Sequence, residues 1–429
     1  MRRPDPRLRP VRPGPASLVV RPRWPRTILI DTASSAPNPA PQAATTWLLS
    51  ACCFASIASM RACDTLLPAI GAEFSVSTGE AARTVFTFAI AYGIFQLCFG
   101  PLGDRYGKLR IISLCALACV IGNSLAFTAM SLDGLVTARI LSGASAAGIF
   151  PLAMAWIGDN VPYETRQTAL ARLVSASVTG VLAGQWLSGL IAEWADWRYT
   201  FMALAVAFLG AGSLLLRTAL AGARLPRSTT AALPPRQALR EILASSTARS
   251  ILTVTTIEGA LAFGALAFIP SLLQRHHDVS LAMAGGIAAC YGIGGFVYAR
   301  LAARLVKRLG EPGLARLGGL LLCVGFVSFA YAPSLVLTPL ACALAGFGFY
   351  GLHNTLQTQA TQMAPGARGM AMSLFACVLF LGQSVGVIAA AWVADHGQDT
   401  WIFALAGGGL LILAQLVAHR TRASQRLAG

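Results

Sequence analysis

Four ionisable side chains lie within long apolar stretches of this sequence, and they are the residues best suited to chemistry. They are Arg61, Asp64, Arg139 and Glu258. An ionisable group inside a bilayer costs about 2.5–3.5 kcal/mol on insertion scales unless it is paired or faces a water-filled cavity. A carboxylate that alternates between an apolar cavity and a neighbouring cation changes its affinity for protons. These residues therefore predict proton binding inside a membrane.

Asp64 is the best candidate for the main proton-binding carboxylate. Arg61 stands three positions before it, so the two side chains share a helix face, and Arg139 lies at a similar expected depth. We expect Arg61 or Arg139 to hold the charged form of Asp64. Glu258 is either a second proton site or a selector for cationic substrates. The alternative for both carboxylates is a permanent ion pair that only joins helices.

Twelve apolar stretches of about 20 residues must position these side chains, since each is long enough to cross a hydrocarbon core. Of the 429 residues, 55% are hydrophobic and 12% are charged, about half the ~25% charged residues usual in soluble domains. A soluble enzyme, a secreted domain and a nucleic-acid-binding domain are therefore excluded. The predicted spans are 46–70, 82–101, 111–130, 135–157, 168–191, 199–219, 249–272, 281–303, 314–332, 335–357, 369–392 and 401–419.

Weak self-similarity divides these spans into two sets of six. Gly143 recurs 203 positions later as Gly346, and Gly184 recurs 198 positions later as Gly382. Such matches in order indicate a duplication in which both halves share one orientation, as in some secondary transporters. We therefore expect an all-α membrane protein with two parallel six-helix halves around a central cavity. The expected segments are a disordered Arg- and Pro-rich tail (1–45), a first bundle (46–219), a linker (220–248), a second bundle (249–419) and a short tail (420–429).

The basic residues predict orientation in the membrane. The net charge is +16, and the first 45 residues hold eight Arg against two acids. If the N-terminus is cytoplasmic, the outer loops hold only Arg83, Arg198 and Arg275. This asymmetry places both termini in the cytoplasm. The strong preference for Arg over Lys fits a GC-rich bacterial genome, so we expect the protein in the inner membrane of a bacterium. An overextended start site is an alternative explanation of the first 45 residues.

The most specific motif stands between the second and third spans. It reads Gly100-Pro-Leu-Gly103-Asp104-Arg105-Tyr-Gly107-Lys108-Leu-Arg110. The glycines would allow a tight turn between two helices, and Asp104 can cap a helix or pair with a cation. Arg105, Lys108 and Arg110 would hold the segment in the cytoplasm. The counterpart in the second half has Lys307 at the Asp104 position, so any gate built on both should be asymmetric.

This segment resembles the signature cytoplasmic loop of the major facilitator superfamily. The resemblance implies a cytoplasmic gate that also includes Asp159, an acid able to pair with cations of the loop. The stretch around Arg139 is similar to the intramembrane Arg motif of the family. Gly180, Gly184 and Gly189 are similar to the glycine motif of its antiporters, although Gln185 replaces the usual Pro; close helix packing is the alternative explanation. Over about 46–420, the chain resembles the twelve-span proton-coupled efflux group.

Other polar and aromatic side chains within the spans are candidates for lining a substrate cavity, since such groups usually face protein or water. They are Tyr92, Gln96, Gln185, Trp186, Tyr291, His353, Asn354, Gln357 and Gln383. Of these, His353, Asn354 and Gln357 occupy a single helical turn, which makes that turn the best substrate-contacting face. Alternatively, His353 only bonds a neighbouring carbonyl group.

We expect a secondary active transporter that exports a small molecule or drug in exchange for protons by alternating access, and not an enzyme. No phosphate-binding loop and no Cys/His spacing for a metal is present in the sequence, so no cofactor or metal is expected. The expected partners are a small-molecule substrate, protons and the lipid bilayer, with no nucleic acid, and the chain is expected to be a monomer. Uptake or exchange of a sugar or other metabolite without proton antiport is the alternative. A non-transporting membrane receptor or enzyme is the remote alternative.

Overall fold

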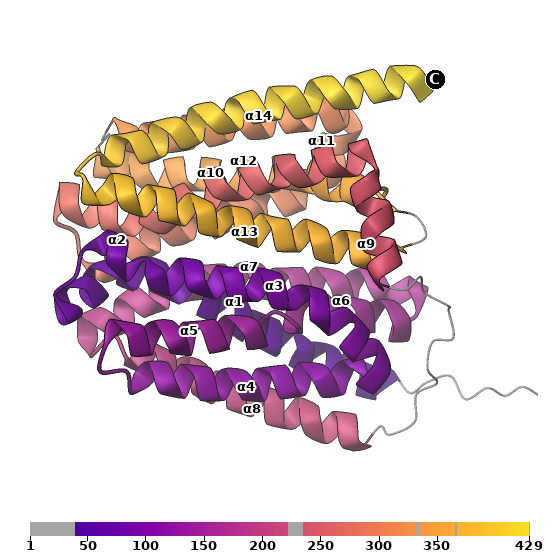
Figure 1. The fold of residues 1–429 in the computed structure, drawn as a ribbon, viewed down its shortest axis with the longest axis horizontal. Coiled ribbons are helices and arrows are strands. Elements are labelled where there is room, and N and C mark those ends of the chain that lie inside the picture. Colours follow the sequence, from indigo (N-terminus) through magenta and orange to yellow (C-terminus); the bar gives the residue numbers. More distant parts are fainter. Residues whose placement is uncertain (1–38, 222–234, 332–333, 365–366, 429) are drawn as a thin grey trace, which may run out of the picture. The chain divides into compact units, whose positions relative to one another are not determined.

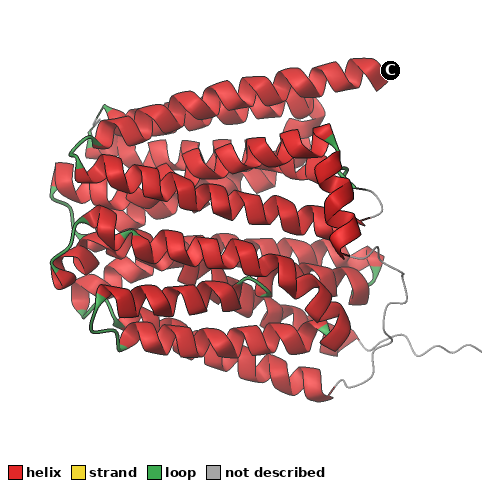
Figure 2. Ribbon diagram, viewed as in Figure 1, coloured by secondary structure: helices red, strands yellow, loops and turns green. Residues whose placement is uncertain are grey.

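The computed structural model describes residues 39–221, 235–331, 334–364 and 367–428, and within these ranges the regular structure is helical (Figure 2). The predicted tail over 1–38 lies outside the described residues. The helices of the first half are α1 (Pro39–Phe74), α2 (Thr78–Ala81), α3 (Arg83–Tyr106), α4 (Lys108–Phe127), α5 (Leu132–Ala146), α6 (Ile149–Asn160), α7 (Tyr163–Trp194) and α8 (Tyr199–Ala221). The later helices are α9 (Pro235–Ala244), α10 (Ser246–His277), α11 (Leu281–Ala330), the 3₁₀ helix η1 (Leu335–Leu337), α12 (Thr338–Ala360), α13 (Arg368–Asp395) and α14 (Asp399–Ala428).

Eleven helical stretches of the described residues are long and apolar enough to cross a membrane. One of them, α11, has 50 residues and is broken at Gly310, where φ is 62° and ψ is 175°. A continuous helix of that length would measure about 75 Å, more than twice the ~30 Å of a hydrocarbon core. Because α11 therefore supplies two spans, the expected twelve-span, all-α fold is confirmed.

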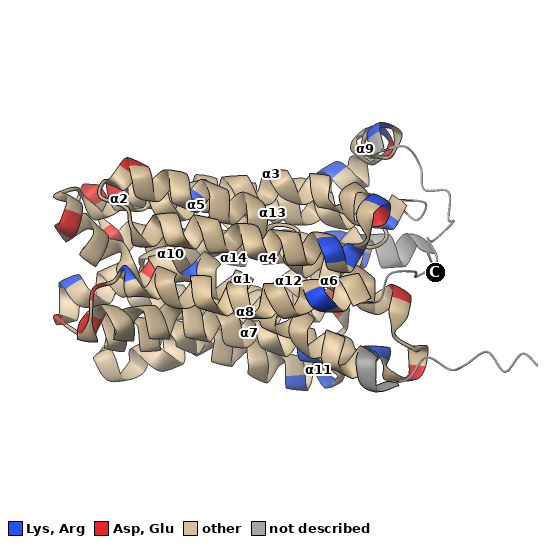
Figure 3. Ribbon diagram, turned by 90° about the horizontal axis from the view of Figure 1, so that it is seen from below, with Lys and Arg blue, Asp and Glu red and all other residues tan. Residues whose placement is uncertain are grey.

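The helices run alongside one another in two groups (Figure 1). The first group consists of α1 to α8, and the second consists of α10 to α14. The groups meet where α3 packs on α13 and where α7 packs on α11. Figure 3 shows few charged residues along the middle of the helices, and Lys and Arg gathered at the end that carries α9.

The two ends of the helical region and the linker differ most from the sequence prediction. The first span begins at Pro39 instead of 46, and the last continues to Ala428 instead of ending at 419. Hydropathy marks where apolar side chains end, whereas backbone hydrogen bonding continues through polar residues at the membrane surface. The predicted linker over 220–248 contains a further helix, α9, although its residues 222–234 lie outside the described part.

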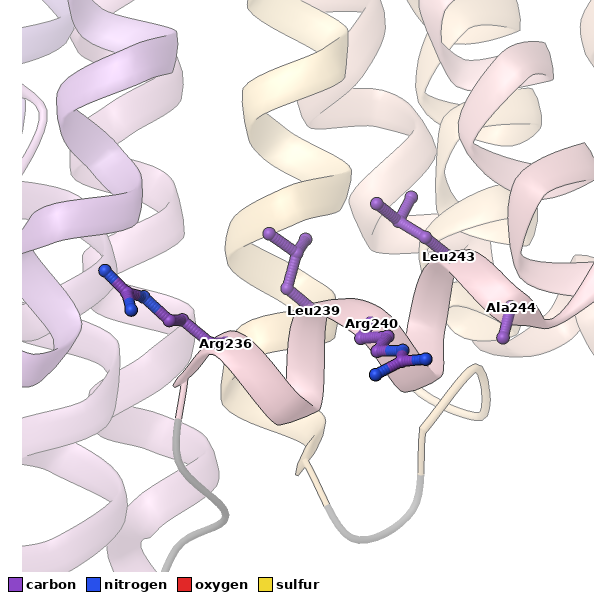
Figure 4. Close-up of a pocket in the computed structure, with 5 residues that line it drawn as sticks. All are labelled: Arg236, Leu239, Arg240, Leu243 and Ala244. Carbon is purple, nitrogen blue, oxygen red and sulfur yellow. The ribbon is translucent and has the colours of Figure 1, made fainter.

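Helix α9 is amphipathic and packs with one face on the second half. Ala238 and Ile242 are buried, and Ile242 contacts an apolar cluster that includes residues of α10 and α13. Arg236 and Arg240 lie on the exposed side, where they line a shallow pocket together with leucines of the same helix (Figure 4). Ten residues are too few to cross a membrane, so a search for long apolar stretches misses this helix.

Close glycine contacts recur in both halves and support the duplication. A Cβ atom placed on Gly184 of α7 would lie 2.5 Å from the carbonyl oxygen of Ala58 in α1. A Cβ on Gly386 of α13 would meet the carbonyl of Ala260 in α10 in the same way. Both members of the second contact stand 202 positions after those of the first. The match of Gly184 to Gly382 drawn from the sequence is therefore displaced by one helical turn.

Replacing Gly184 by Ala is expected to destabilise the protein, because the added methyl group would overlap the Ala58 carbonyl group. Overpacking of this kind costs about 1–3 kcal/mol. Gly408 provides a matched control, since a Cβ there meets nothing within 4 Å. Thermal unfolding in detergent should show a lower midpoint for Gly184→Ala than for Gly408→Ala. Equal midpoints for the two variants would contradict the packing argument.

Candidate functional site

Helix α1 brings Arg61 and Asp64 together as a buried ion pair. Arg61 Nη1 lies 3.5 Å from Asp64 Oδ2, and the two side chains are 4% and 0% exposed. The other carboxylate oxygen, Oδ1, accepts no hydrogen bond from the described residues. The side chain of Gln185 in α7 lies close to the same carboxylate. A buried carboxylate with one long ion-pair contact and one free oxygen can accept a proton with little rearrangement.

The same arginine also contacts the other half of the protein. The Arg61 guanidinium lies over the ring of Phe263 in α10, 4.4 Å from its centroid. Phe263 stands 202 positions after Arg61, the offset that relates the glycine contacts of the two halves. A residue that touches its own symmetry counterpart lies near the axis that relates the two. The ion pair of Arg61 and Asp64 is therefore close to the pseudo-twofold axis between the halves.

Arg139 is buried but does not join this ion pair. Its Nε donates to the Thr84 carbonyl oxygen at 3.2 Å, and its Nη1 donates to Ser59 Oγ at 3.4 Å. No described carboxylate lies within 4.0 Å of the guanidinium. Of the two cations proposed to hold Asp64, the structure places Arg61 in contact. Arg139 instead connects α5 to α3 and α1 through Thr84 and Ser59.

The second carboxylate pairs with a histidine from another helix. Glu258 of α10 is fully buried, and its Oε2 lies 3.0 Å from Nδ1 of His353 in α12. The imidazole is stacked on Phe349, with ring centroids 5.1 Å apart, and its ring also packs near Phe375 at 5.3 Å. Oε1 of Glu258 accepts no hydrogen bond from the described residues. The sequence interpretation had no means of finding this pair, because 95 positions separate its members.

Aromatic rings join the two ionisable pairs into one buried network. The ring of Phe349 lies 4.9 Å from that of Phe263, which in turn lies under the guanidinium of the first pair. The contacts follow the order Asp64, Arg61, Phe263, Phe349, His353 and Glu258. The network crosses from α1 through α10 to α12, so it includes groups from both halves.

The predicted cavity residues differ in burial and in their contacts. Trp186 is 49% exposed and lies against Gly286. Four of the predicted cavity residues have a buried polar side-chain atom without a hydrogen-bond partner among the described residues: Gln96, Gln185, Tyr291 and Gln383. Three others, all on α12, are half-buried: His353, Asn354 and Gln357. The ring of Tyr92 packs on that of Phe380 in α13, with centroids 4.6 Å apart. A buried polar group without a protein partner is a place for water or a substrate.

The motif between α3 and α4 contributes to a cluster of three charged residues. Lys108 Nζ lies 2.8 Å from Asp104 Oδ1 and 2.8 Å from Asp159 Oδ2. The acid that the family resemblance offered as a partner for this segment is thus paired with Lys108. Arg105 and Arg110 are exposed, and neither forms an ion pair with a described residue. All three residues of the cluster belong to the first half.

The glycines of this motif do not all form a turn, contrary to the sequence prediction. Helix α3 continues through Gly100 and Gly103 to Tyr106, and only Gly107, with φ of 93°, breaks it before α4. A Cβ on Gly103 would lie 2.5 Å from a methyl group of Leu152 in α6, so this glycine permits helix packing. A positive φ favours glycine, which explains Gly107 alone.

The glycines of α7 are likewise packing positions. A Cβ on Gly180 would lie 2.7 Å from the carbonyl oxygen of Phe54 in α1, and one on Gly189 would meet the Leu281 carbonyl at the start of α11. Close approach of small residues is a general device of membrane helices. The geometry of these glycines therefore supplies no separate argument for antiport.

Comparisons with known proteins agree with this fold. The Major Facilitator Superfamily profile matches residues 49–367. A chloramphenicol resistance protein of Streptomyces lividans is 27% identical over 361 residues, which cover 83% of this chain and 91% of that protein. The multidrug export protein EmrB of Haemophilus influenzae is 27% identical over 160 residues, 36% of this chain and 31% of that one.

Solved transporter structures share the fold at low sequence identity. The peptide transporter POT has a TM-score of 0.73 at 14% identity, covering 89% of this chain and 95% of its own. A bacterial homologue of the human lysosomal transporter Spinster, in an inward-facing and occupied conformation, has a TM-score of 0.68 at 17% identity. That alignment covers 90% of this chain and 97% of the homologue.

Proposed function

This chain belongs to the major facilitator superfamily, whose members transport small molecules across membranes, and we propose that it exports a small molecule in exchange for protons. The observation that carries the proposal is the buried carboxylate of Asp64 beside the pseudo-twofold axis, with one oxygen free. A group at that place is reached from opposite sides of the membrane when two halves rock about it. Protonation on one side and release on the other would then drive export.

Arg61 contacts both halves, so protonation of Asp64 would change the balance of contacts between them. The guanidinium has one partner in its own half, Asp64, and another in the opposite half, the ring of Phe263. When Asp64 accepts a proton, the ion pair is lost while the cation–π contact remains. The balance of contacts at the axis then shifts toward the second half. Protonated and ionised Asp64 would therefore favour different conformations, which is what proton-driven alternating access requires.

We assign Glu258 and His353 together as a second titratable site. The buried Glu258 carboxylate already has the imidazole as its partner at 3.0 Å, so a cationic substrate would have to displace that ring. A proton shared between the two groups requires no such displacement. The pair therefore suits proton binding better than selection of cations.

The proposed orientation places both termini in the cytoplasm of a bacterial inner membrane. Lys and Arg gather at the end of the bundle that carries α9 (Figure 3), and cytoplasmic ends of membrane proteins are enriched in these residues. The cluster of Asp104, Lys108 and Asp159 would then act at the cytoplasmic gate.

An uncharged amphipathic drug is the proposed substrate class, and chloramphenicol is the first compound to test. The relative that this chain covers almost completely is named a chloramphenicol resistance protein. The two acids and two Arg buried within the membrane spans, Asp64, Glu258, Arg61 and Arg139, leave this part of the interior close to neutral, which suits an uncharged molecule. The aromatic rings between the ionisable pairs offer an apolar surface beside free polar atoms.

Proton release from energised inside-out vesicles tests this function. Respiration acidifies the lumen, and inward movement of chloramphenicol in exchange for protons should restore the fluorescence of a pH-gradient dye. Vesicles without the protein measure passive entry of the drug. If labelled chloramphenicol crosses by counterflow and no tested compound moves protons, the protein is an exchanger or uniporter and the coupling proposal is wrong.

A further inference from the structure

Two carboxylates at the end of the bundle opposite α9 bond to the backbone of the opposite half. Glu193, near the end of α7, accepts a hydrogen bond from the N–H of Ala282 in the first turn of α11 at 3.1 Å. Asp395, the last residue of α13, accepts one from the N–H of Gly79 at 2.9 Å and another from the hydroxyl of Ser77 at 2.7 Å.

These two contacts are copies of each other. Asp395 stands 202 positions after Glu193, and Ala282 stands 203 positions after Gly79. The serines that begin the two contacted helices, Ser77 and Ser280, also stand 203 apart, and each accepts a bond from the third residue that follows it. A contact that occurs twice, in both copies of a duplicated bundle, is a property of the interface between halves. It is not an isolated surface bond.

Electrostatic attraction between a carboxylate and a helix N-terminus favours both contacts. Each carboxylate faces unpaired N–H groups at the start of a membrane span, where the helix dipole attracts negative charge. The span that begins at Thr78 continues through α2 and α3 to Tyr106, so the group bonded by Asp395 belongs to a long helix. A Cβ on Gly79 would lie 2.6 Å from the Ala391 carbonyl oxygen and would also overlap the Asp395 carboxylate. The absence of a side chain there allows the close approach.

Among the described residues, the end of the bundle that carries α9 has no comparable charged connection between the halves. The Lys108 cluster stays within the first half, and the other ion pairs of the described residues likewise join groups of a single half. Charged hydrogen bonds between the halves are therefore found at the end that we assign to the outer face.

From this geometry we propose that Glu193 and Asp395 are paired latches that hold the outer face closed, and that both release when it opens. The inference rests on the proposed alternating access, but it concerns conformation and requires neither a substrate nor proton coupling. Because the contacts are symmetric, loss of one should loosen the outer face partly, and loss of both should add the two effects.

Electron spin–spin distance measurements on the full-length protein in nanodiscs test the latches directly. Spin labels at Met130 and Val336, which are 90% and 82% exposed, report the separation of the halves at the outer end; exposed Cys98 is replaced by Ser in every sample. The wild type should show mainly the short distance. Each of Glu193→Gln and Asp395→Asn should raise the ratio of open to closed molecules about two- to fivefold, and the double variant, with both effects multiplied, about four- to 25-fold.

Asp133→Asn is the matched control. It removes an exposed acid from the same end of the bundle, but the Asp133 partner, Arg83, belongs to the same half. Its distance distribution should equal that of the wild type. A second route to opening is Gly79→Val, which blocks the approach of α13 sterically and leaves both carboxylates in place.

An unchanged distribution in the double variant would overturn the proposal, as would an equal shift in Asp133→Asn. Gel-filtration elution and the helical circular dichroism signal establish that each variant is folded. If the distances shift while wild-type vesicles show no proton release, the latches stand and the proposed proton coupling falls. If wild-type vesicles release protons and the distances of the double variant do not shift, the proton coupling is supported and the proposed role of Glu193 and Asp395 is wrong.

Discussion

Replacing Asp64 by Asn should abolish substrate-driven proton release while the protein remains folded in the membrane. Asn has nearly the shape of a protonated Asp, but it neither binds nor releases a proton in the transport cycle. In energised inside-out vesicles, chloramphenicol should leave the pH gradient of this variant at the level of vesicles without protein. Exchange of labelled for unlabelled substrate requires no net proton movement, and it should persist.

Glu73→Gln is the control for this experiment. The Glu73 carboxylate is exposed and pairs with Arg198, away from the buried ion pairs of the site, so its loss should leave proton release unchanged. Normal coupling in Asp64→Asn would show that Asp64 is a permanent member of an ion pair and would remove it from the proton path.

The permanent ion pair makes a distinct prediction about stability. Removing one member of a buried pair costs about 3–5 kcal/mol because it leaves an uncompensated charge, whereas replacing both members by apolar groups is often neutral. If the pair of Arg61 and Asp64 is only structural, a double replacement by Leu should restore both stability and coupled transport. If Asp64 carries protons, the double variant should recover stability alone.

The parts of the site that the sequence predicted are those that depend on local spacing. Arg61 and Asp64 are three positions apart, and helical periodicity alone places them on one face. The twelve spans follow from stretches of apolar residues, since a bilayer imposes a minimum length. Gly310 even divides α11 into two spans where the sequence expects a boundary.

The parts that the sequence did not predict depend on contacts between distant segments. No periodicity connects Glu258 with His353, because the pair exists only where α10 crosses α12. Arg139 was placed near Asp64 by depth, yet its rotation on α5 directs it to Thr84 and Ser59 instead. Depth in a membrane follows from sequence position, but the orientation of a helix about its axis is set by packing.

Glu258→Gln and His353→Gln should each reduce coupled export of chloramphenicol about tenfold or more. A hydrogen bond to a charged group contributes about 1.5–3 kcal/mol, which corresponds to roughly a 10- to 150-fold change. Because the two side chains contact each other at 3.0 Å, the double variant should lose about as much as either single variant. Initial rates in proteoliposomes with an imposed pH gradient measure all three.

Thr358→Ala serves as the matched control on α12, since its exposed hydroxyl donates to the Asn354 carbonyl of its own helix and to no other described residue. A lipophilic cation tested beside chloramphenicol separates the two roles of Glu258. If Glu258→Gln lost export of the cation and kept that of the uncharged drug, the carboxylate would be a selector. We expect both compounds to be affected equally, because the imidazole already occupies the position that a substrate cation would need and only a proton fits between the two groups.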